Sequence, residues 1–255
     1  SKNFIEKCLR SLYSYSLDRK NIEIIIVDNA SIDSSPDIIK NKFPEVKLII
    51  NEKNRGFTKA MNQGIKLATG KFIMLLNPDT EFTEPFWQKI IKYFDDNPYV
   101  GVIGPKIVNP DFSLQISAFR ELNLFDIFIE SLLLNKIFPK IRVFNRHDIY
   151  PNLSLNPIEV DWVSGAAIII RRSVLETAGF LDENIFMYLE DADICRRIRK
   201  KGYKIIYWPK NIIKHFEVGR GRFYSDRYFS AFKICMTCIS SVSYTHLRAH
   251  ETVLD

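Results

Sequence analysis

Blocks of apolar residues alternate with amphipathic segments along the first hundred residues of the chain. Short runs that are apolar throughout are typical of strands covered on both faces of a sheet. Segments with apolar residues three and four positions apart predict helices that pack on such a sheet. The strands expected in this part are 22–27, 46–50, 71–76 and 100–104, and the expected helices are 3–17, one beginning at Ser35, 57–68 and 83–96.

The second half of the chain is less regular. Residues 110–157 show no repeating pattern apart from an amphipathic segment at 122–138, and we interpret this stretch as an insertion over one edge of the sheet. Regular alternation then returns. The elements expected there are a strand at 165–170, a helix ending near Gly179, a helix at 189–201 and a strand at 203–208.

Repeated strand–helix–strand units imply right-handed crossover connections. We therefore predict an α/β fold with a doubly wound, mostly parallel sheet, in one domain over residues 1–229. Residues 230–255 are expected to hold a truncated C-terminal helix, followed from Val242 by a tail whose pattern matches nothing before it. We interpret that tail as non-native, and the metal-like spacing of His246 and His250 within it receives no weight.

The composition, 46% hydrophobic and 26% charged, is that of a chain with a packed core. The net charge of +6 and the pI near 9.0 fit an anionic ligand, an anionic membrane surface or nucleic acid. The cysteines form only one C-x-x-C pair, so we expect reduced thiols and a reducing, cytoplasmic compartment. No apolar run reaches the length of a membrane span, and the segment 122–138 is interpreted as a core helix, a lid or a membrane-surface contact.

Polar residues stand directly after three of the predicted strands. Asp28 follows the first strand, and Asp79 follows the third, where Pro78 ends the strand because proline cannot donate a ladder hydrogen bond. The residues after the second strand are Asn54, Arg55 and Gly56. Each residue alone is typical of a turn. Because the carboxyl ends of parallel strands meet at one edge, the three groups together predict a site for a ribose, a phosphate or a metal.

The last predicted helix carries acidic residues at its start and basic residues at its end, as the helix dipole favours. Capping explains the charge of Glu190 and Asp191, but not the face that Asp191 occupies. Asp191, Ile194, Cys195 and Ile198 are spaced i, i+3, i+4 and i+7, so Asp191 shares the apolar face. A carboxylate turned toward a cleft can act as a general base. On spacing alone, Asp191 fits a helix-capping residue and a general base equally well.

Two further positions have both a structural and a functional interpretation. Trp162, followed by Gly165 in the sequence DWVSGA, offers an aromatic face that can stack on a sugar, and it fits a core position equally well. His215 follows an apolar stretch and is structural unless a metal lies nearby.

Five stretches, in their order along the chain, resemble the glycosyltransferase family 2 enzymes of GT-A fold, in their bacterial rhamnosyltransferase-like branch. They are IEIIIVDNASIDSS, NRGFTKAMNQGI, FIMLLNPDT, the long segment from DWVSGA to RIRKKGYKI, and IIKH. Together they extend over most of residues 21–215. Each stretch alone would be a weak signal, whereas the ordered set is specific.

The resemblance implies a role for each matching residue. Asp191 would be the catalytic base, with Glu190 beside it at the acceptor side. Asp79 would hold a divalent cation, Mg²⁺ or Mn²⁺, which His215 would approach. The residues implied for nucleotide-sugar binding are Asp28, Asn54, Arg55, Gly56, Asn62 and Asn77, and those implied for the acceptor are Trp162 and Gly165.

The sequence departs from the family pattern in two places. Asn77 stands where many relatives carry the first carboxylate of Asp-x-Asp, so one carboxylate would hold the metal and its occupancy would depend on the donor phosphates. The family's first strand and donor-binding loop would precede Ser1, and its last helices are cut short beyond about Phe229. We therefore expect a GT-A sheet that lacks its first strand, in a fragment of a longer enzyme.

The implied activity is inverting transfer of a sugar, rhamnose or a similar one, from a nucleoside-diphosphate-sugar to a saccharide or lipid-linked acceptor in cell-surface polysaccharide synthesis. We expect a cytoplasmic location, with peripheral contact at the inner membrane surface left open. We expect no nucleic-acid partner, because no aromatic residues interleave the basic run at 196–204. The alternatives are a sugar-phosphate nucleotidyltransferase, against which Glu190 and Asp191 argue, and a non-catalytic carbohydrate- or nucleotide-binding protein.

Overall fold

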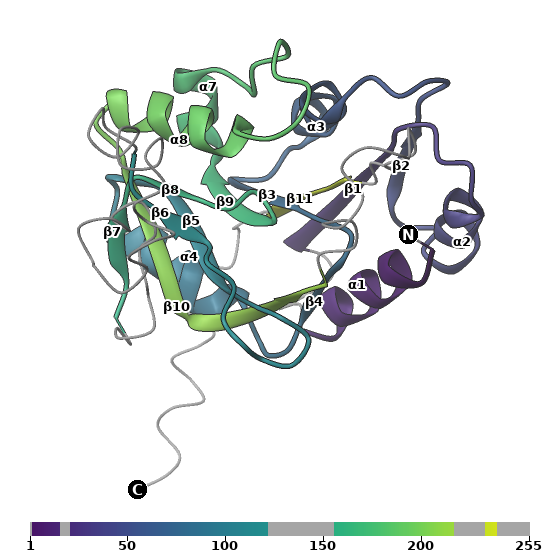
Figure 1. Ribbon diagram of the computed structural model, residues 1–255, viewed down its shortest axis with the longest axis horizontal. Helices are drawn as coiled ribbons and strands as arrows, with labels where there is room; N and C mark the ends of the chain where they lie inside the picture. Colours follow the sequence, from purple (N-terminus) through teal and green to yellow (C-terminus); the bar gives the residue numbers. More distant parts are fainter. Residues whose placement is uncertain (1, 16–20, 122–155, 217–232, 239–255) are drawn as a thin grey trace, which may run out of the picture.

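The computed structural model describes residues 2–15, 21–121, 156–216 and 233–238. In these ranges helices cover both faces of a central sheet (Figure 1). The helices are α1 (Lys2–Ser14), α2 (Ser35–Lys42), α3 (Phe57–Leu67), α4 (Trp87–Asp96), α7 (Arg172–Ala178) and α8 (Glu190–Lys200). The strands are β1 (Ile22–Asp28), β2 (Lys47–Ile50), β3 (Phe72–Leu76), β4 (Thr80–Phe82), β5 (Val100–Val108), β6 (Ala118–Phe119), β7 (Ile158–Val160), β8 (Trp162–Val163), β9 (Ala167–Arg171), β10 (Lys204–His215) and β11 (Lys233–Cys238).

The central sheet is mixed, and the prediction of a mostly parallel sheet is wrong. Its strand order is β2-β1-β11-β3-β9-β5-β10-β4, with β7 also paired to β10. Among the strands of the described ranges, only β1 with β2 and β5 with β10 run parallel. β9 lies antiparallel between β3 and β5 because the chain, having left the end of β5, comes back into the sheet from that same end.

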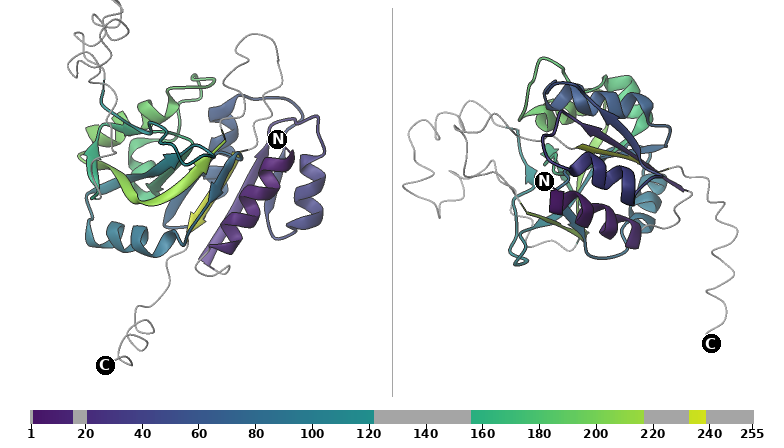
Figure 2. Two further views of the ribbon diagram at one scale, coloured as in Figure 1. Left: turned by 60° about the horizontal axis from the view of Figure 1, so that its bottom comes forward. Right: turned by 90° about the vertical axis from the view of Figure 1, so that its right-hand side faces the viewer.

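Alternate residues of the strands feed two hydrophobic layers, as the two-residue period of a strand dictates. On one face Ile24 and Met74 pack with the helices α1, α2 and α4. On the other face Ile25 and Ile73 pack with α3, α7 and α8. Figures 1 and 2 show this arrangement of helices on both sides of the strands. The α/β layering expected from the apolar runs is therefore confirmed.

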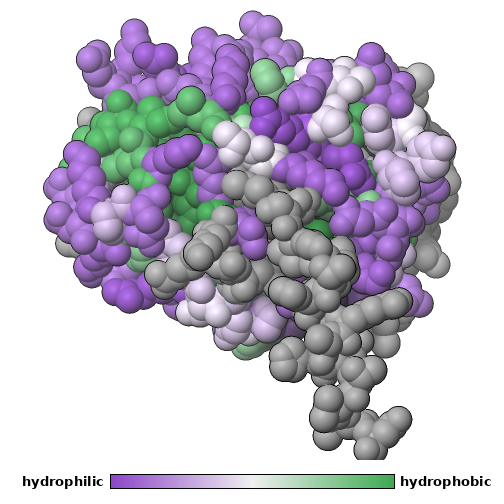
Figure 3. Space-filling model, turned by 180° about the vertical axis from the view of Figure 1, so that it is seen from behind, coloured by the Kyte–Doolittle hydropathy of each residue, from purple (hydrophilic) through white to green (hydrophobic). Residues whose placement is uncertain are grey.

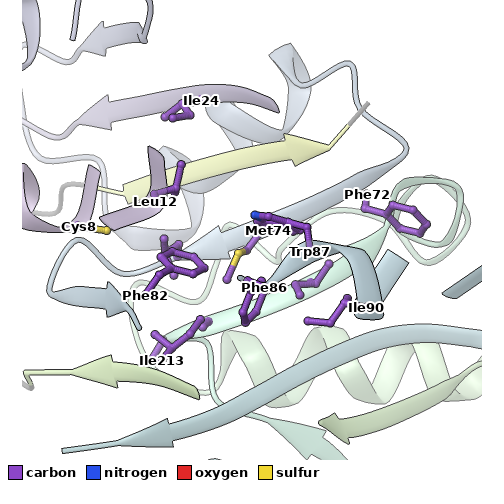
Figure 4. Packing of buried hydrophobic residues seen from close by; sticks show 14 of the residues in the cluster. Cys8, Leu12, Ile24, Phe72, Met74, Phe82, Phe86, Trp87, Ile90 and Ile213 are labelled. Carbon is purple, nitrogen blue, oxygen red and sulfur yellow. The ribbon is translucent and has the colours of Figure 1, made fainter. Parts of the chain in front are cut away.

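Near the end of β3, side chains from three elements and the residue before α4 meet in the first of these layers (Figure 4). Cys8 and Leu12 come from α1, Phe82 from β4 and Ile213 from β10, and Phe86 lies next to Phe82 with their rings edge to face. All are nearly inaccessible to solvent. This packing gives the turn between β3 and β4 a rigid base.

Several element boundaries differ from the expected ones. β10 continues past Pro209 to His215, because a register shift between Trp208 and Ile212 absorbs the proline and pairing with β5 resumes beyond it. α4 begins at Trp87, after Pro85, rather than at Thr83.

Residues 233–238, where a truncated helix was expected, form the strand β11 instead. β11 pairs antiparallel with both β1 and β3. Its backbone therefore satisfies hydrogen-bonding groups on the facing edges of two strands, which a helix at the same place would leave unpaired. The amphipathic segment 122–138 and the tail from Val242 lie outside the described residues.

The rear face of the molecule carries a hydrophobic area on one side, bordered by hydrophilic residues (Figure 3). Within the described ranges, the helices are all too short or too polar to cross a bilayer. Cys8 and Cys195 are buried free thiols, as expected. Burial raises the pKa of each to about 12, so neither is a ready nucleophile.

Candidate active site

The end of β3 and the start of α8 are linked through residues 165–166 by two hydrogen bonds, each donated by a backbone N–H. The Asn77 N–H donates to the Ala166 carbonyl over 2.9 Å, beside the pairing of Leu76 with Ala167. The Gly165 N–H then donates to Asp191 Oδ2 over 2.8 Å. The turn that carries Asp79 and the helix that carries Asp191 therefore meet at one end of the sheet.

Asp79 and His215 face each other across the antiparallel pair of β4 and β10. Thr80 pairs with His215, and the Phe216 N–H donates to the Asp79 carbonyl over 2.9 Å. His215 Nε2 lies 3.4 Å from Asp79 Oδ1, with the two side chains 13% and 17% exposed. Asn77 Nδ2 lies 3.4 Å from the same ring nitrogen. The structure thus places Asp79 and His215, the two residues predicted for a metal, side by side, with Asn77 next to them.

The turn that holds Asp79 is fixed from inside the protein. Thr80 Oγ1 donates to the Asn77 carbonyl over 2.7 Å and closes the turn. Cys8 Sγ lies 3.4 Å from Thr80 Oγ1, so α1 supports the turn from below. A metal-binding carboxylate gains from such rigidity, because less conformational freedom is lost when a ligand binds.

Asp79 and His215 are suited to a hard divalent cation with a partly open coordination shell. They offer one carboxylate oxygen and one imidazole nitrogen. Within the described ranges, no group of three His, Cys, Asp or Glu side chains lies close enough to form a closed protein site. Mg²⁺ and Mn²⁺ commonly take their remaining ligands from water and substrate phosphates. The donor set therefore fits a cation that arrives with a diphosphate.

Asp191 begins the inward face of α8 and is held by main-chain donors. Its Oδ2 accepts from Gly165, and its Oδ1 accepts from the Ala192 N–H over 2.9 Å. Burial raises the pKa of Asp191 above its ordinary range, and these hydrogen bonds oppose the shift only in part. A raised pKa improves a carboxylate as a proton acceptor. Glu190 beside it is buried, with 8% of its surface exposed.

Gly165 leaves room beside Asp191. A Cβ at Gly165 would lie 3.4 Å from both Cβ and Oδ2 of Asp191. The indole of Trp162 stacks on Phe119 with ring centroids 3.9 Å apart. One face of Trp162 is therefore covered by protein, and a saccharide could stack only on the other. The core interpretation holds for the face against Phe119, and stacking on a sugar remains a prediction.

The loop after β2 is organised by Asn29, a residue that the sequence analysis did not single out. Asn29 Nδ2 donates to Asn54 Oδ1 over 2.8 Å and to the Gly56 carbonyl over 3.1 Å. Asn29 Oδ1 accepts from the Arg55 N–H over 2.9 Å and from Asn51 Nδ2 over 3.2 Å. The only signal for Asn29 in the sequence was its position directly after Asp28. Two adjacent polar residues at a strand end can form hydrogen bonds with two different loops.

Asp28 lies at the end of β1 as predicted, but it is only 1% exposed. Its Oδ1 accepts from the Ser31 N–H over 3.1 Å, and its carbonyl accepts from the Asn51 N–H over 2.8 Å. Asp28 therefore closes a turn and joins β1 to the loop after β2. Its contact with a nucleotide base remains a prediction.

Asn62 lies on α3 and binds the segment that leads into α8. Its Nδ2 donates to the Leu181 carbonyl over 2.9 Å and to Glu183 Oε1 over 3.1 Å. Its Oδ1 accepts from the Leu181 N–H over 3.1 Å. All of these partners are protein groups, so the geometry makes Asn62 a positioning residue.

The start of α3 is tied to the same segment. The Phe57 N–H donates to the Phe186 carbonyl over 2.9 Å, and Thr58 Oγ1 donates to the Ile185 carbonyl over 2.6 Å. The segment ends with Tyr188 and Leu189, both in the left-handed region with φ of 69° and 67°. Non-glycine residues avoid this conformation, at a cost of order 1 kcal/mol each. Hydrogen bonds thus connect the start of α3, which follows the loop after β2, to the segment that leads into α8.

Known proteins are similar to this chain in sequence and in fold. An N-acetylglucosaminyl-diphospho-decaprenol L-rhamnosyltransferase of Mycobacterium tuberculosis is 28% identical over 224 residues, which cover 83% of this chain and 71% of that protein. A crystal structure of GalNAc-T7 with UDP, GalNAc and Mn²⁺ superposes with a TM-score of 0.61 at 15% identity, covering 85% of this chain and 41% of that one.

A mannosyltransferase from Pyrobaculum calidifontis, in complex with GDP-Man and Mn²⁺, superposes with a TM-score of 0.57 at 19% identity, covering 87% of this chain and 55% of that one. The chain thus spans about half the length of these two solved chains, and at such identities they show a shared fold. The family model described as glycosyl transferase family 2 matches residues 1–177. The chain therefore belongs to glycosyl transferase family 2.

Proposed function

We propose that this chain is the catalytic part of an inverting glycosyltransferase. It would transfer a sugar, rhamnose or a similar one, from a nucleoside-diphosphate-sugar to a saccharide or lipid-linked acceptor in cell-surface polysaccharide synthesis. The observation that carries this proposal is the hydrogen-bonded path from Asn77 through Ala166 and Gly165 to Asp191. It holds a cation-binding turn and a carboxylate of raised pKa at one end of the sheet.

Asp191 is the base in this proposal. As the acceptor hydroxyl attacks the anomeric carbon, its proton passes to a carboxylate oxygen of Asp191, while the bond from that carbon to the diphosphate oxygen breaks. Because a hydroxyl has a very high pKa, proton transfer and attack are concerted, and positioning supplies much of the rate. The main-chain donors from Gly165 and Ala192 fix the carboxylate for this step.

Asp79 and His215 serve the donor side. When bound there, Mg²⁺ or Mn²⁺ neutralises charge on the departing nucleoside diphosphate. Asn77 lies within reach of the same place and would donate its amide to a phosphate oxygen. Asn54, Arg55 and Gly56 would form the other wall. Asn29 holds them in place, and the Arg55 guanidinium would contact phosphate oxygens.

The acceptor would enter beside Gly165, where the missing side chain leaves room next to Asp191. The half-buried indole of Trp162 would stack on its sugar ring. The named activity of the mycobacterial relative supports a lipid-linked acceptor. We therefore place the enzyme in the cytoplasm, in peripheral contact with the inner membrane surface.

The proposal is tested with a panel of UDP-, GDP- and deoxythymidine-diphosphate sugars and a lipid-linked N-acetylglucosamine acceptor, in Mn²⁺ or in EDTA. We expect metal-dependent transfer and a product whose anomeric configuration, read by NMR, is inverted. Asp191→Asn should lose transfer by at least about a thousandfold while its affinity for the nucleoside diphosphate stays within about twofold, since the base acts only in the chemical step. Retained turnover in Asp191→Asn, or a product of retained configuration, contradicts the proposal.

A further inference from the structure

Gln115 reaches the ring of His215 from the turn that follows β5. The chain reverses there through a hydrogen bond from the Asn109 N–H to the Ser113 carbonyl, 2.8 Å long. The Gln115 N–H then donates to the Ile107 carbonyl over 3.0 Å, so Gln115 lies against the end of β5. Since β10 is paired with β5 at this end, Gln115 comes beside His215 although 100 residues separate them. Its side chain is buried, with 9% exposed.

The orientation of the Gln115 amide follows from its partners. Its Nε2 donates to the His215 carbonyl over 2.8 Å and to Asn109 Oδ1 over 2.6 Å. A main-chain carbonyl can only accept, so the amide nitrogen must be on that side. Gln115 Oε1 consequently faces His215 Nδ1, at 3.0 Å. An amide oxygen also only accepts, so Nδ1 must carry a proton.

The geometry points to Gln115 as a positioning residue that selects the tautomer of His215. A neutral imidazole has one N–H, and with that proton on Nδ1 the ring presents a lone pair at Nε2. Nε2 is the atom that lies 3.4 Å from Asp79 Oδ1. The contact with Gln115 therefore makes His215 an acceptor at the place where a cation would bind.

The opposite tautomer of His215 would prevent Asp79 and His215 from binding a cation together. With its proton on Nε2, His215 would donate to Asp79 Oδ1, and the two side chains would satisfy each other rather than a cation. Asn77 Nδ2, a donor, lies 3.4 Å from Nε2, which agrees with a lone pair there. Outer partners of this kind orient metal-binding histidines in proteins generally, and their loss weakens metal affinity by about 10- to 100-fold.

The inference about cation binding rests on the proposed function, whereas the tautomer does not, and the experiment separates them. Histidine labelled with ¹⁵N is observed in long-range ¹H–¹⁵N spectra at a pH where the ring is neutral, with His215→Asn used to assign its signals. In the wild type we expect a protonated Nδ1 and an unprotonated Nε2. Gln115→Leu, which fills the same space without an acceptor, should move the proton to Nε2 in a large fraction of molecules.

Asn109→Ala is the matched control, because it removes one partner of the Gln115 amide in the same turn but leaves Oε1 against Nδ1. Asn109→Ala should keep the wild-type tautomer of His215. If Gln115→Leu acted only by disturbing the turn, both variants would change the tautomer. In parallel, Mn²⁺ affinity in the presence of UDP is measured by electron paramagnetic resonance, and Gln115→Leu should weaken it by about 10- to 100-fold.

A wild-type ring protonated on Nε2, or an unchanged tautomer in Gln115→Leu, overturns the inference about Gln115. A wild type that holds the expected tautomer but binds Mn²⁺ no better than His215→Ala supports the control by Gln115. The Mn²⁺ affinity in that case overturns the role of His215 in the proposed function.

Discussion

Gly165 and Asp191 are matched to each other across a single hydrogen bond. The Gly165 N–H donates to Asp191 Oδ2 over 2.8 Å, and the space where a Gly165 side chain would stand borders the same carboxylate. One residue thereby orients the proposed base and leaves an approach to it. Positioning of the base and access for the acceptor are coupled at Gly165.

Gly165→Ala separates access from folding. The added Cβ would meet Asp191 atoms at 3.4 Å, an ordinary van der Waals distance, and no positive φ opposes alanine at this position. We expect the free energy of unfolding to change by less than about 1 kcal/mol. The KM for the acceptor should rise at least about tenfold, with the affinity for the nucleoside diphosphate unchanged. Urea unfolding and initial-rate kinetics check the two expectations, and an unchanged acceptor KM would place the acceptor elsewhere.

The raised pKa of Asp191 sets the direction of a pH dependence. Only the ionised carboxylate accepts a proton, so kcat/KM should fall as pH is lowered through the folded-state pKa of Asp191. Because burial has raised that pKa, the acid limb should lie above the value of about 3.9 for an unperturbed aspartate. A profile of kcat/KM against pH measures it, and an acid limb at or below that value would argue against Asp191 as the base.

The contribution of Asp191 to the free energy of unfolding should change with pH in the direction opposite to kcat/KM. A carboxyl whose pKa is raised by folding binds its proton more tightly in the folded state, so its contribution to the free energy of unfolding is full at low pH. That contribution is lost as pH rises through the folded-state pKa. Comparing the pH dependence of urea unfolding for the wild type and Asp191→Ala isolates it.

Asn62→Ala tests the connection between α3 and the segment before α8. The change removes three hydrogen bonds to Leu181 and Glu183, two of them to main-chain groups of Leu181. Leaving such buried groups unpaired costs about 1–3 kcal/mol. We expect a loss of stability in that range, faster hydrogen exchange at the Leu181 amide, and a lower kcat, since α8 begins a few residues later.

Lys66→Ala is the matched control for Asn62→Ala. Lys66 approaches the same Glu183 from α3, at 3.8 Å, through an exposed ion pair. Such pairs are worth about 0–1 kcal/mol. Stability and Leu181 exchange should therefore stay close to the wild type. Equal effects in the two variants would show that the contact with Glu183, rather than the hydrogen bonds to Leu181, connects α3 to the segment before α8.

The local chemistry of the chain predicts where strands end but not which way they run. Pro78 marks the end of β3 and thus the position of Asp79, and the apolar spacing on α8 identifies the inward face of Asp191. The direction of β9 is expressed in its antiparallel pairing with β3 and β5, which are distant in sequence, and no local pattern specifies that pairing. The rule that proline ends a strand fails at Pro209, because a register shift in β10 absorbs it. His215 thereby enters the sheet.

The supporting amides of the site are the part that sequence reasoning misses. Asn29 bonds to a loop 25 residues away, and Gln115 bonds to a histidine 100 residues away. Neither forms a pattern with its own neighbours in sequence, and asparagine and glutamine are common in surface turns. Their roles emerge only when pairing of the strands brings distant segments together. Carboxylates at strand ends are visible in the sequence, whereas the groups that orient their partners are not.

Gly56→Ala and Gly202→Ala form a pair that separates backbone strain from a specific contact. The two glycines have nearly the same φ, 85° and 86°. A Cβ at Gly56 would lie 2.9 Å from Cδ2 of Phe186, whereas a Cβ at Gly202 would meet nothing within 4 Å. Gly56, with ψ of 166°, lies in a region that essentially only glycine adopts, and both variants bear positive-φ strain of about 1–3 kcal/mol, which unfolding measures.

Only Gly56→Ala should also affect the donor. The Phe186 ring is 61% exposed and can turn aside, so the clash should displace it rather than unfold the protein. Moving Phe186 should disturb the hydrogen bond from the Phe57 N–H to the Phe186 carbonyl. It should also disturb the hydrogen bond from Asn29 Nδ2 to the Gly56 carbonyl. We expect affinity for the nucleoside diphosphate to fall about tenfold in Gly56→Ala and to remain unchanged in Gly202→Ala, as isothermal titration calorimetry can measure. Equal affinities in the two variants would mean that the loop after β2 does not form the donor wall.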